Sequence, residues 1–146
     1  MNVLVDTNVL VRLREAHSLA RPDCDRALRC LRQAGHVLHI CTQVAIEYWV
    51  VITRPREVNG LGLTTEEAES DLQKFEQLFV WLAEPADVGR RWRALVNKHK
   101  VRGRQAHDAR LAAFMNAHGL TTILTLNAAD FARYDGITCL LPSDVK

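Results

Sequence analysis

The chain begins with a short apolar strand that runs directly into three polar residues. Val3–Val5 form an aliphatic run, and Asp6, Thr7 and Asn8 interrupt it before apolar residues resume at Val9. A short apolar run of this kind predicts a strand that is buried on both faces, as in a parallel sheet. A carboxylate buried at the end of such a strand is costly unless donors or a cation compensate its charge. We therefore expect Asp6 to have a specific partner.

Strand-like and helix-like patterns alternate along the rest of the chain. We expect strands at residues 2–5, 36–40, 78–82, 120–126 and 137–141. We expect helices at residues 9–15, 22/23–33, 42–53, 64–75, 86–99 and 106–118, and a short helical turn at 128–131. Helices between successive strands require crossover connections, which produce a parallel sheet covered on both faces. The predicted fold is therefore α/β, a three-layer α/β/α sandwich with a central parallel sheet of four to five strands in a single domain of residues 1–146.

Local signals mark several helix ends. Asp23 and Thr42 are placed to cap the helices that they precede, and Gly35 is placed to end the first of these helices. Thr64 and Glu67 have the spacing of a capping box, in which each side chain binds the backbone N–H of the other residue. These signals predict where the helices begin and end.

Composition and spacing argue against several classes of protein. Apolar residues make up 48% of the chain and charged residues 25%, which is typical of a globular domain. No apolar stretch approaches the roughly 20 residues of a membrane span, no secretion signal is visible, and no G-x-G-x-x-G motif follows the first strand. Four cysteines lack the spacing of a zinc site, so we expect reduced thiols in a cytoplasmic protein: Cys24, Cys30, Cys41 and Cys139.

One basic segment stands out from the rest of the chain. Residues 89–104 contain seven of the 19 basic residues and none of the 17 acidic ones. A local basic patch favours binding to a nucleic-acid backbone, although a solvated helix face has the same pattern. Trp92 lies within the segment and is suited either to base stacking or to core packing. The candidate phosphate-binding residues are Arg90, Arg91, Arg93, Lys98, Lys100, Arg102 and Arg104.

Four carboxylates occur where strands end or helices begin. They are Asp6, Glu47 near the first turn of helix 42–53, Asp108 in the first turn of helix 106–118, and Asp130 just beyond strand 120–126. Each alone fits helix capping or a favourable helix dipole. Together they point toward the carboxyl edge of the sheet, where open parallel sheets bind ligands. Carboxylates gathered at one edge repel one another unless a cation lies between them.

Small polar residues accompany these acids, and together they define the chemistry of a candidate site. The accessory polar residues are Thr7, Asn8, Thr125 and Asn127. A donor set made of oxygen favours Mg²⁺ or Mn²⁺ over zinc. His107 is the only histidine close in sequence to one of the acids and is a secondary candidate for contact with metal or substrate.

These segments carry a resemblance to a known family. LVDTNVL at the N-terminus, a glutamate early in the helix after the second strand, HDARLAA and TLNAADF resemble the PIN-domain nucleases, and most closely the VapC-type toxins of bacterial toxin–antitoxin pairs. The resemblance extends from Asn2 to Pro142. It implies cleavage of RNA that depends on Mg²⁺ or Mn²⁺, a homodimer, and an antitoxin protein that covers the site.

The resemblance also assigns roles to residues of this chain. Asp6, Glu47, Asp108 and Asp130 match the acidic positions of the family, and we expect all four to be catalytic and metal-binding. Asp6 would be the central ligand and Asp108 its partner, Glu47 would bind metal or act as the base, and Asp130 would complete the site. Many relatives have an acid where this chain has Asn127, so a second metal would be held by fewer charges here.

Two other functions compete with a nuclease. In haloacid-dehalogenase-like phosphatases a strand also ends on aspartate, but a second aspartate commonly stands two residues later, where this chain has Asn8. A PIN-like domain that binds RNA or a partner without cutting is the other alternative, although all four acids are present. Large apolar residues in helices 42–53 and 64–75 and just after the latter, including Tyr48, Trp49, Phe75 and Phe79, could leave a groove for an antitoxin helix.

Overall fold

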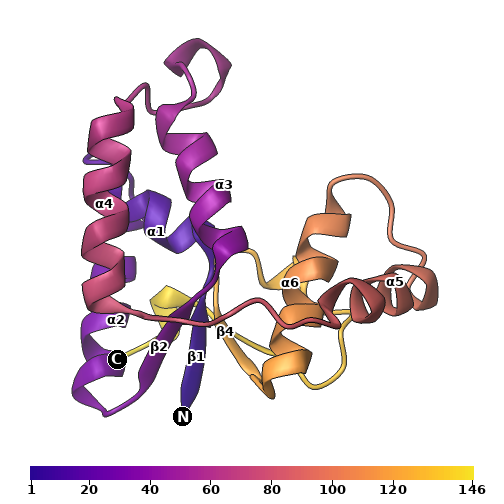
Figure 1. The fold of residues 1–146 in the computed structure, drawn as a ribbon. Coiled ribbons are helices and arrows are strands. Elements are labelled where there is room, and N and C mark those ends of the chain that lie inside the picture. Colours follow the sequence, from indigo (N-terminus) through magenta and orange to yellow (C-terminus); the bar gives the residue numbers. More distant parts are fainter.

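A computed structural model describes residues 1–146 as a five-stranded parallel sheet with helices on both sides (Figure 1). The strands, in the spatial order β3-β2-β1-β4-β5, are β1 (Asn2–Val5), β2 (Val37–Ile40), β3 (Val80–Trp81), β4 (Thr122–Leu124) and β5 (Thr138–Leu140). The helices are α1 (Thr7–Arg14), α2 (Arg21–Gln33), α3 (Thr42–Thr53), α4 (Thr65–Leu78), α5 (Val88–Lys98) and α6 (Gln105–His118). Three short 3₁₀ turns complete the chain: η1 (Arg56–Val58), η2 (Ala128–Asp130) and η3 (Pro142–Asp144).

The strand order creates a switch point between β1 and β4. From β1 the chain moves outward through β2 to β3, with α1 to α4 in the connections, and it then returns through α5 and α6 to β4 on the other side of β1. Because crossover connections are right-handed, opposite directions of travel place these helices on opposite faces of the sheet. Figure 1 shows α1 to α4 on one side and α5 and α6 on the other, which confirms the predicted sandwich.

The register aligns the carboxyl ends of the two central strands. Val5 of β1 pairs with Leu124 of β4, so the next residues of both strands, Asp6 and Thr125, leave the sheet at the same level. Val3–Val5 of β1 and all of β4 are buried, as the opening apolar run predicts, because helices cover each face. The core therefore ends at a point where two polar residues meet.

Several predicted element boundaries are confirmed and others are wrong. Thr64 and Glu67 form the capping box of α4, and Gly35 follows α2 with a φ of 81°. Asp23 does not cap α2, because the helix starts at Arg21 and Asp23 lies within its first turn. Thr42 is the first residue of α3 rather than its cap, which is Cys41.

Strand 78–82 is much shorter than predicted, because its apolar residues serve different elements. Leu78 is the last residue of α4, and only Val80–Trp81 pair with β2. Phe79 turns into the core, where its ring lies 5.7 Å from that of Phe75 in an edge-to-face arrangement. An apolar run alone does not distinguish a strand from the buried end of a helix.

Two helices also begin away from their predicted positions. α1 starts at Thr7 instead of residue 9, because Asp6 accepts a hydrogen bond from the Thr7 N–H and caps the helix. α5 starts at Val88 instead of residue 86. None of the helices is long and apolar enough to cross a membrane.

Candidate functional site

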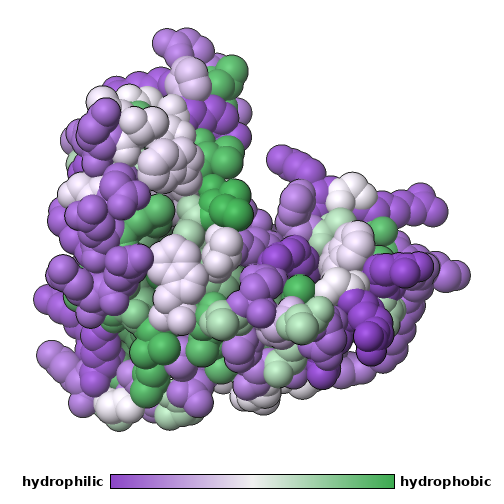
Figure 2. Space-filling view, in the orientation of Figure 1, coloured by the Kyte–Doolittle hydropathy of each residue, from purple (hydrophilic) through white to green (hydrophobic).

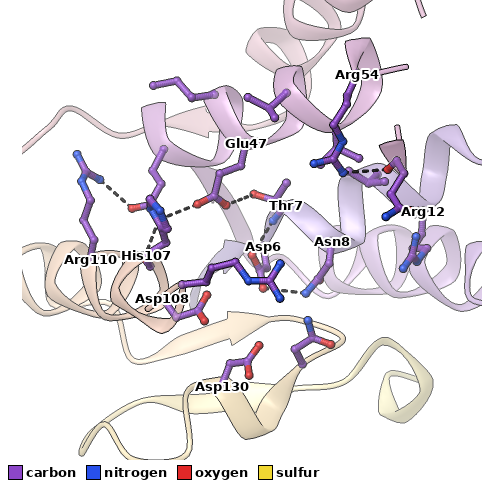
Figure 3. Close-up of a pocket in the computed structure, with 18 of the residues that line it drawn as sticks. Asp6, Thr7, Asn8, Arg12, Glu47, Arg54, His107, Asp108, Arg110 and Asp130 are labelled. Atoms are coloured by element: carbon purple, nitrogen blue, oxygen red, sulfur yellow. Dashed lines mark hydrogen bonds between the residues drawn. The ribbon is translucent and has the colours of Figure 1, made fainter. Parts of the chain in front are cut away.

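A cleft of about 960 Å³ opens where the carboxyl ends of the central strands meet (Figure 3). Residues of α1, α3 and the start of α6 line it, together with η2 and the residue before it. All four carboxylates predicted from the sequence line this cleft: Asp6, Glu47, Asp108 and Asp130. The fold therefore brings together acids that lie more than 120 residues apart in the chain.

Asp6 is held by three donors. Its Oδ1 accepts a hydrogen bond from the Thr7 backbone N–H at 2.7 Å. Its Oδ2 accepts from the Thr125 hydroxyl at 2.6 Å and from the Asn8 amide at 3.0 Å. The side chain is almost completely buried, so these donors replace the water that a carboxylate requires.

The accessory polar residues fasten the end of β1 to the end of β4. The Asn8 Oδ1 accepts a hydrogen bond from the Leu126 N–H at 3.1 Å, and the Asn8 amide also lies 3.2 Å from the Thr125 hydroxyl oxygen. That oxygen accepts from the Asn127 N–H at 3.1 Å. Thr125 and Asn8 thus orient Asp6, while the Asn127 side chain lines the cleft.

Glu47 is also held, with one donor at each carboxylate oxygen. The Thr7 hydroxyl donates to Oε2 at 2.9 Å, and the Gln43 amide donates to Oε1 at 3.0 Å. Glu47 is the sixth residue of α3 and lies in its second turn, directly after the first turn near which the sequence placed it. The helix dipole at the N-terminus therefore does not explain its position, and its two side-chain donors do.

Asp108 and Asp130 lie on the other side of the cleft without such support. Asp108 is in the first turn of α6 and Asp130 is the last residue of η2. Neither carboxylate has a hydrogen bond to the residues drawn in Figure 3. These two side chains therefore depend on solvent or a ligand for their partners.

Burial and mutual repulsion shift the acidity of two of these groups. Burial raises the pKa of Asp6 to about 6, against the lowering effect of its bonds from Thr125 and Thr7. Burial, followed by the charge of Asp130 and the smaller effects of Asp6 and Glu47, raises the pKa of Asp108 to about 7. Like charges thus face one another across the cleft.

The donor set fits a hard divalent cation. All four candidates are carboxylates, and none forms an ion pair with lysine or arginine, since the salt bridges of this chain involve other acids. A cation placed among them would relieve the repulsion that adds to the effect of burial on the pKa of Asp108. Mg²⁺ and Mn²⁺ prefer such oxygen ligands.

The predicted four-ligand site is not closed in this arrangement of side chains. No group of three or more histidine, cysteine, aspartate or glutamate side chains converges closely enough to hold a metal ion. Mg²⁺ is usually bound by one or two carboxylates, with water and substrate phosphates as its other ligands. Metal binding by all four acids together stays a prediction.

The arginines of the cleft differ from those that the sequence favoured. Four arginines line it, from three parts of the chain: Arg12, Arg54, and Arg104 with Arg110. Of the seven basic residues predicted to bind RNA, only Arg104 is among them. The other six lie on α5 and in the loop after it, all exposed: Arg90, Arg91, Arg93, Lys98, Lys100 and Arg102.

Contacts on α5 favour a structural role for part of this basic segment. Arg91 pairs with Asp87 at 2.7 Å, one turn earlier in sequence. Trp92 packs against the core and donates its indole N–H to the Ala106 carbonyl at 2.9 Å, which supports core packing rather than base stacking. Phosphate binding by the exposed residues stays a prediction.

Sequence reasoning missed Gln43 and Arg54, which lie at helical spacing from the predicted Glu47. Gln43, Glu47 and Arg54 follow one another at helical spacing, and all three line the cleft. Spacings of four and seven residues place side chains on the same face of a helix, so a polar stripe in an otherwise apolar helix was the available signal. His107 also lines the cleft, as the secondary candidate.

Exposed apolar residues lie on the cleft side of α3 rather than between α3 and α4. Tyr48 is buried, with its ring 4.9 Å from Phe75, and its hydroxyl donates to Asp71 at 2.8 Å. Ile46 and Val50 are 58% and 48% exposed and line the cleft. Figure 2 shows hydrophobic surface along α3. A shallow pocket of about 460 Å³ lies between α3 and α4, where the groove was expected, and its lining is polar except for Trp49.

Comparisons with known proteins agree with this geometry. The sequence model of the PIN domain matches residues 3–137. A search of curated protein sequences finds no match.

Solved structures share the fold at low sequence identity. A chain of VapBC2 from Rickettsia felis, in a structure bound to a DNA fragment from their promoter, is 17% identical with a TM-score of 0.72, covering 97% of this chain and 98% of that one. VapBC-1 from nontypeable Haemophilus influenzae is 13% identical with a TM-score of 0.71, covering 98% and 99%. VapC20 of Mycobacterium tuberculosis, a toxin that cleaves the sarcin-ricin loop, is 18% identical with a TM-score of 0.61, covering 83% and 86%.

Proposed function

The chain belongs to the PIN-domain family, and from that premise we propose that it is an endoribonuclease that depends on Mg²⁺ or Mn²⁺ and serves as the toxin of a toxin–antitoxin pair. The observation that carries this proposal is the meeting of Asp6, Glu47, Asp108 and Asp130 at one cleft, where none of them forms an ion pair with the arginines that line it. Four acids of one sign need a compensating cation, and a cation beside carboxylates suits hydrolysis of a phosphodiester.

Different residues of the cleft would have different roles in hydrolysis. Asp6 and Asp108 would hold the ion, with Asp130 completing the site. When bound, the ion supplies Lewis-acid stabilisation of charge on the phosphoryl oxygens and a more acidic water. Glu47, oriented by its two donors, would accept the proton of the attacking water.

The arginines that line the cleft would hold the substrate backbone. Arg12 and Arg54 lie on the α1 and α3 side, and Arg104 and Arg110 lie at the start of α6. Guanidinium groups bind phosphate through several N–H donors. The exposed basic residues of α5 would extend this surface and raise the rate of encounter with RNA.

Two alternatives remain distinguishable by experiment. A haloacid-dehalogenase-like phosphatase would need an acid at the position of Asn8, whose side chain instead bonds Asp6, Thr125 and the Leu126 N–H. A PIN-like domain that binds without cutting would retain metal and RNA binding but release no product. The presence of all four acids in one cleft supports the nuclease.

We also propose the partners that the family resemblance implies. Ile46 and Val50 offer an apolar surface beside the acids, which suits an antitoxin helix that covers the site. The Rickettsia felis and Haemophilus influenzae relatives are VapBC proteins, and another neighbour is a toxin–antitoxin complex from Klebsiella pneumoniae. We expect a homodimer in the cytoplasm, which light scattering of the purified protein and fractionation of cells would test.

The first test is cleavage of RNA by the purified protein without its partner. Total RNA would be incubated with wild type and with Asp6→Asn, each with EDTA, Mg²⁺ or Mn²⁺. Cleavage that requires the metal and is lost in the variant is the expected result. Equal degradation by both proteins would reveal a contaminating nuclease. Binding of Mn²⁺ and RNA without cleavage of any RNA would favour the binding domain.

A further inference from the structure

Gln43 is a buried glutamine whose side-chain amide is fully used. It is the second residue of α3, only 7% exposed, and it borders the cleft. Its Nε2 donates to the Glu47 Oε1 at 3.0 Å and to the His107 carbonyl at 2.8 Å. Its Oε1 accepts a hydrogen bond from Arg110 at 2.8 Å. The amide therefore satisfies both N–H donors and its oxygen with protein groups.

The partners of Gln43 define the orientation of its amide. The nitrogen faces a carboxylate and a carbonyl, which only accept, and the oxygen faces a guanidinium, which only donates. A flipped amide would place oxygen against two acceptors and nitrogen against a donor. These partners require N–H donors on one side and an oxygen acceptor on the other, which glutamine has and neither leucine nor glutamate provides.

Gln43 also bridges the two helix layers of the molecule. α3 and α6 lie on opposite sides of the sheet (Figure 1), and both side-chain hydrogen bonds between them involve Gln43. His107 immediately precedes Asp108, so the bridge ends beside an acid of the opposite wall. Arg110 is held in turn by Glu84, in the segment between β3 and α5.

We propose that Gln43 is a positioning residue, which orients the Glu47 carboxylate and sets its separation from Asp108 by tying α3 to the first turn of α6. This inference rests on the proposed function, in which both acids take part in metal-dependent cleavage. Glu47 has only one other side-chain donor, the Thr7 hydroxyl, which binds the opposite oxygen. Loss of Gln43 would leave one oxygen of Glu47 without its donor. It would also remove the hydrogen bonds that hold α3 and α6 at a set distance from each other.

The test separates positioning from simple support of the fold. Gln43→Leu removes all three hydrogen bonds at similar volume, and Gln43→Glu keeps the shape but sets oxygen against Glu47 and the His107 carbonyl. Arg110→Met removes the donor to the glutamine oxygen together with the ion pair to Glu84, and it serves through its Mn²⁺ affinity if a direct variant fails to fold. Gln73→Leu is the matched control, because Gln73 is exposed on α4 and bonds only Glu69.

Two quantities would be measured for each folded variant. Free Mn²⁺, followed by electron paramagnetic resonance, gives the metal affinity without reference to activity. Cleavage of a defined RNA oligonucleotide gives kcat and KM separately. We expect Gln43→Leu to lose about 10- to 100-fold in Mn²⁺ affinity or kcat, as outer-shell partners of metal ligands do. Its KM for RNA should change less, and Gln73→Leu should match the wild type.

A double mutant with Glu47→Gln shows whether Gln43 acts through Glu47. In that background Gln43→Leu should cause a much smaller further loss, because the residue that it orients has already been changed. A variant that melts earlier than wild type yet retains its Mn²⁺ affinity and kcat would overturn the inference while leaving the nuclease intact. A wild-type protein that neither binds Mn²⁺ nor cleaves RNA would overturn both.

Discussion

The two halves of the cleft bring the same chemical group to the site in opposite ways. Asp6 and Glu47, the anchored acids, accept hydrogen bonds at both of their oxygens from Thr7 and other polar neighbours. Asp108 and Asp130, the unanchored acids, accept none from the residues around them (Figure 3). Folding alone therefore orients one pair of carboxylates, whereas the other pair remains free to respond to a cation and a substrate.

This difference shows how a stable fold can accommodate a charged site. Donors around the anchored acids are supplied by the ends of β1 and β4 and by α3, so their orientation belongs to the architecture of the sheet. The unanchored acids lie on α6 and η2, where burial and then repulsion raise the pKa of Asp108 to about 7. Preorganisation on one side and unsatisfied charge on the other together favour binding of a cation.

The largest expected effect is the loss of RNA cleavage when one acid of either pair is replaced. Asp6→Asn and Asp108→Asn should each lower the Mn²⁺-dependent rate by on the order of 10²–10³-fold, since each removes a charge that stabilises the reaction. Single-turnover cleavage of an RNA oligonucleotide would measure this. An Asp108→Asn protein as active as wild type would restrict the chemistry to the anchored acids.

Two threonines, Thr122 in β4 and Thr125 just after it, test the anchoring itself. Thr125→Val removes the hydroxyl that donates to Asp6 and accepts from the Asn127 N–H, so the Asp6 Oδ2 keeps only the Asn8 amide and the Asn127 N–H loses its partner. We expect a loss of about 1–3 kcal/mol in the free energy of unfolding. The control is Thr122→Val, because the hydroxyl of Thr122 lies only near the Met1 sulfur at 3.9 Å. Equal losses in urea titrations of both variants would contradict a special role for the Thr125 hydroxyl.

The stability of the metal-free protein should depend on pH through Asp6 and Asp108. Folding raises their pKa values from 3.8 to about 6 and about 7, so the folded protein binds more protons than the unfolded chain between these limits. The free energy of unfolding therefore falls as pH rises from about 4 to about 7. Thermal unfolding in EDTA at pH 5, 6, 7 and 8 would follow it.

Asp108→Asn sharpens this pH comparison. With the repelled charge removed, the variant should be more stable than wild type at pH 8 by about 1–2 kcal/mol, after allowance for solvent screening. Mn²⁺ should stabilise wild type at pH 8 more than it stabilises the variant. A variant whose unfolding follows the same pH profile as wild type would show that the charge of Asp108 does not destabilise the folded protein.

The smallest expected effect concerns two arginines near the ends of the basic segment. Arg104 lines the cleft and Arg93 lies exposed on α5. Arg104→Gln should raise KM for RNA and lower the slope of log KM against log salt by about 1, as expected for a lost phosphate contact. Arg93→Gln should change KM and the slope of its salt dependence less than Arg104→Gln does. A larger effect of Arg93→Gln than of Arg104→Gln would indicate that α5 is the main phosphate-binding surface.

Much of the fold could be predicted because its signals are local. The alternation of strands and helices, the capping box at Thr64 and the glycine after α2 depend on residues close together in the chain. The errors occurred where one apolar run serves several elements. Residues 78–82 end a helix, fill the core and form only a two-residue strand, and periodicity alone does not separate these uses.

The candidate site was predictable to a lesser extent. All four acids reach one cleft because parallel strands share their carboxyl edge. Six of the seven predicted RNA-binding residues do not line that cleft, because density of charge along the chain says little about where each side chain points. Arg12, Arg54 and Arg110 were missed because they lie outside the basic segment, at widely separated positions of the chain, and come together only in space.

By itself, then, the sequence determined the order of elements, the parallel sheet and the four acids at its carboxyl edge, since local periodicity and the rules of crossover connections specify them. Only the tertiary structure decided which acids are anchored and that Gln43 joins α3 to α6. The hydrogen bonds responsible connect residues 64 and 119 positions apart. Such bonds depend on side-chain distances of about 3 Å, which no local pattern encodes.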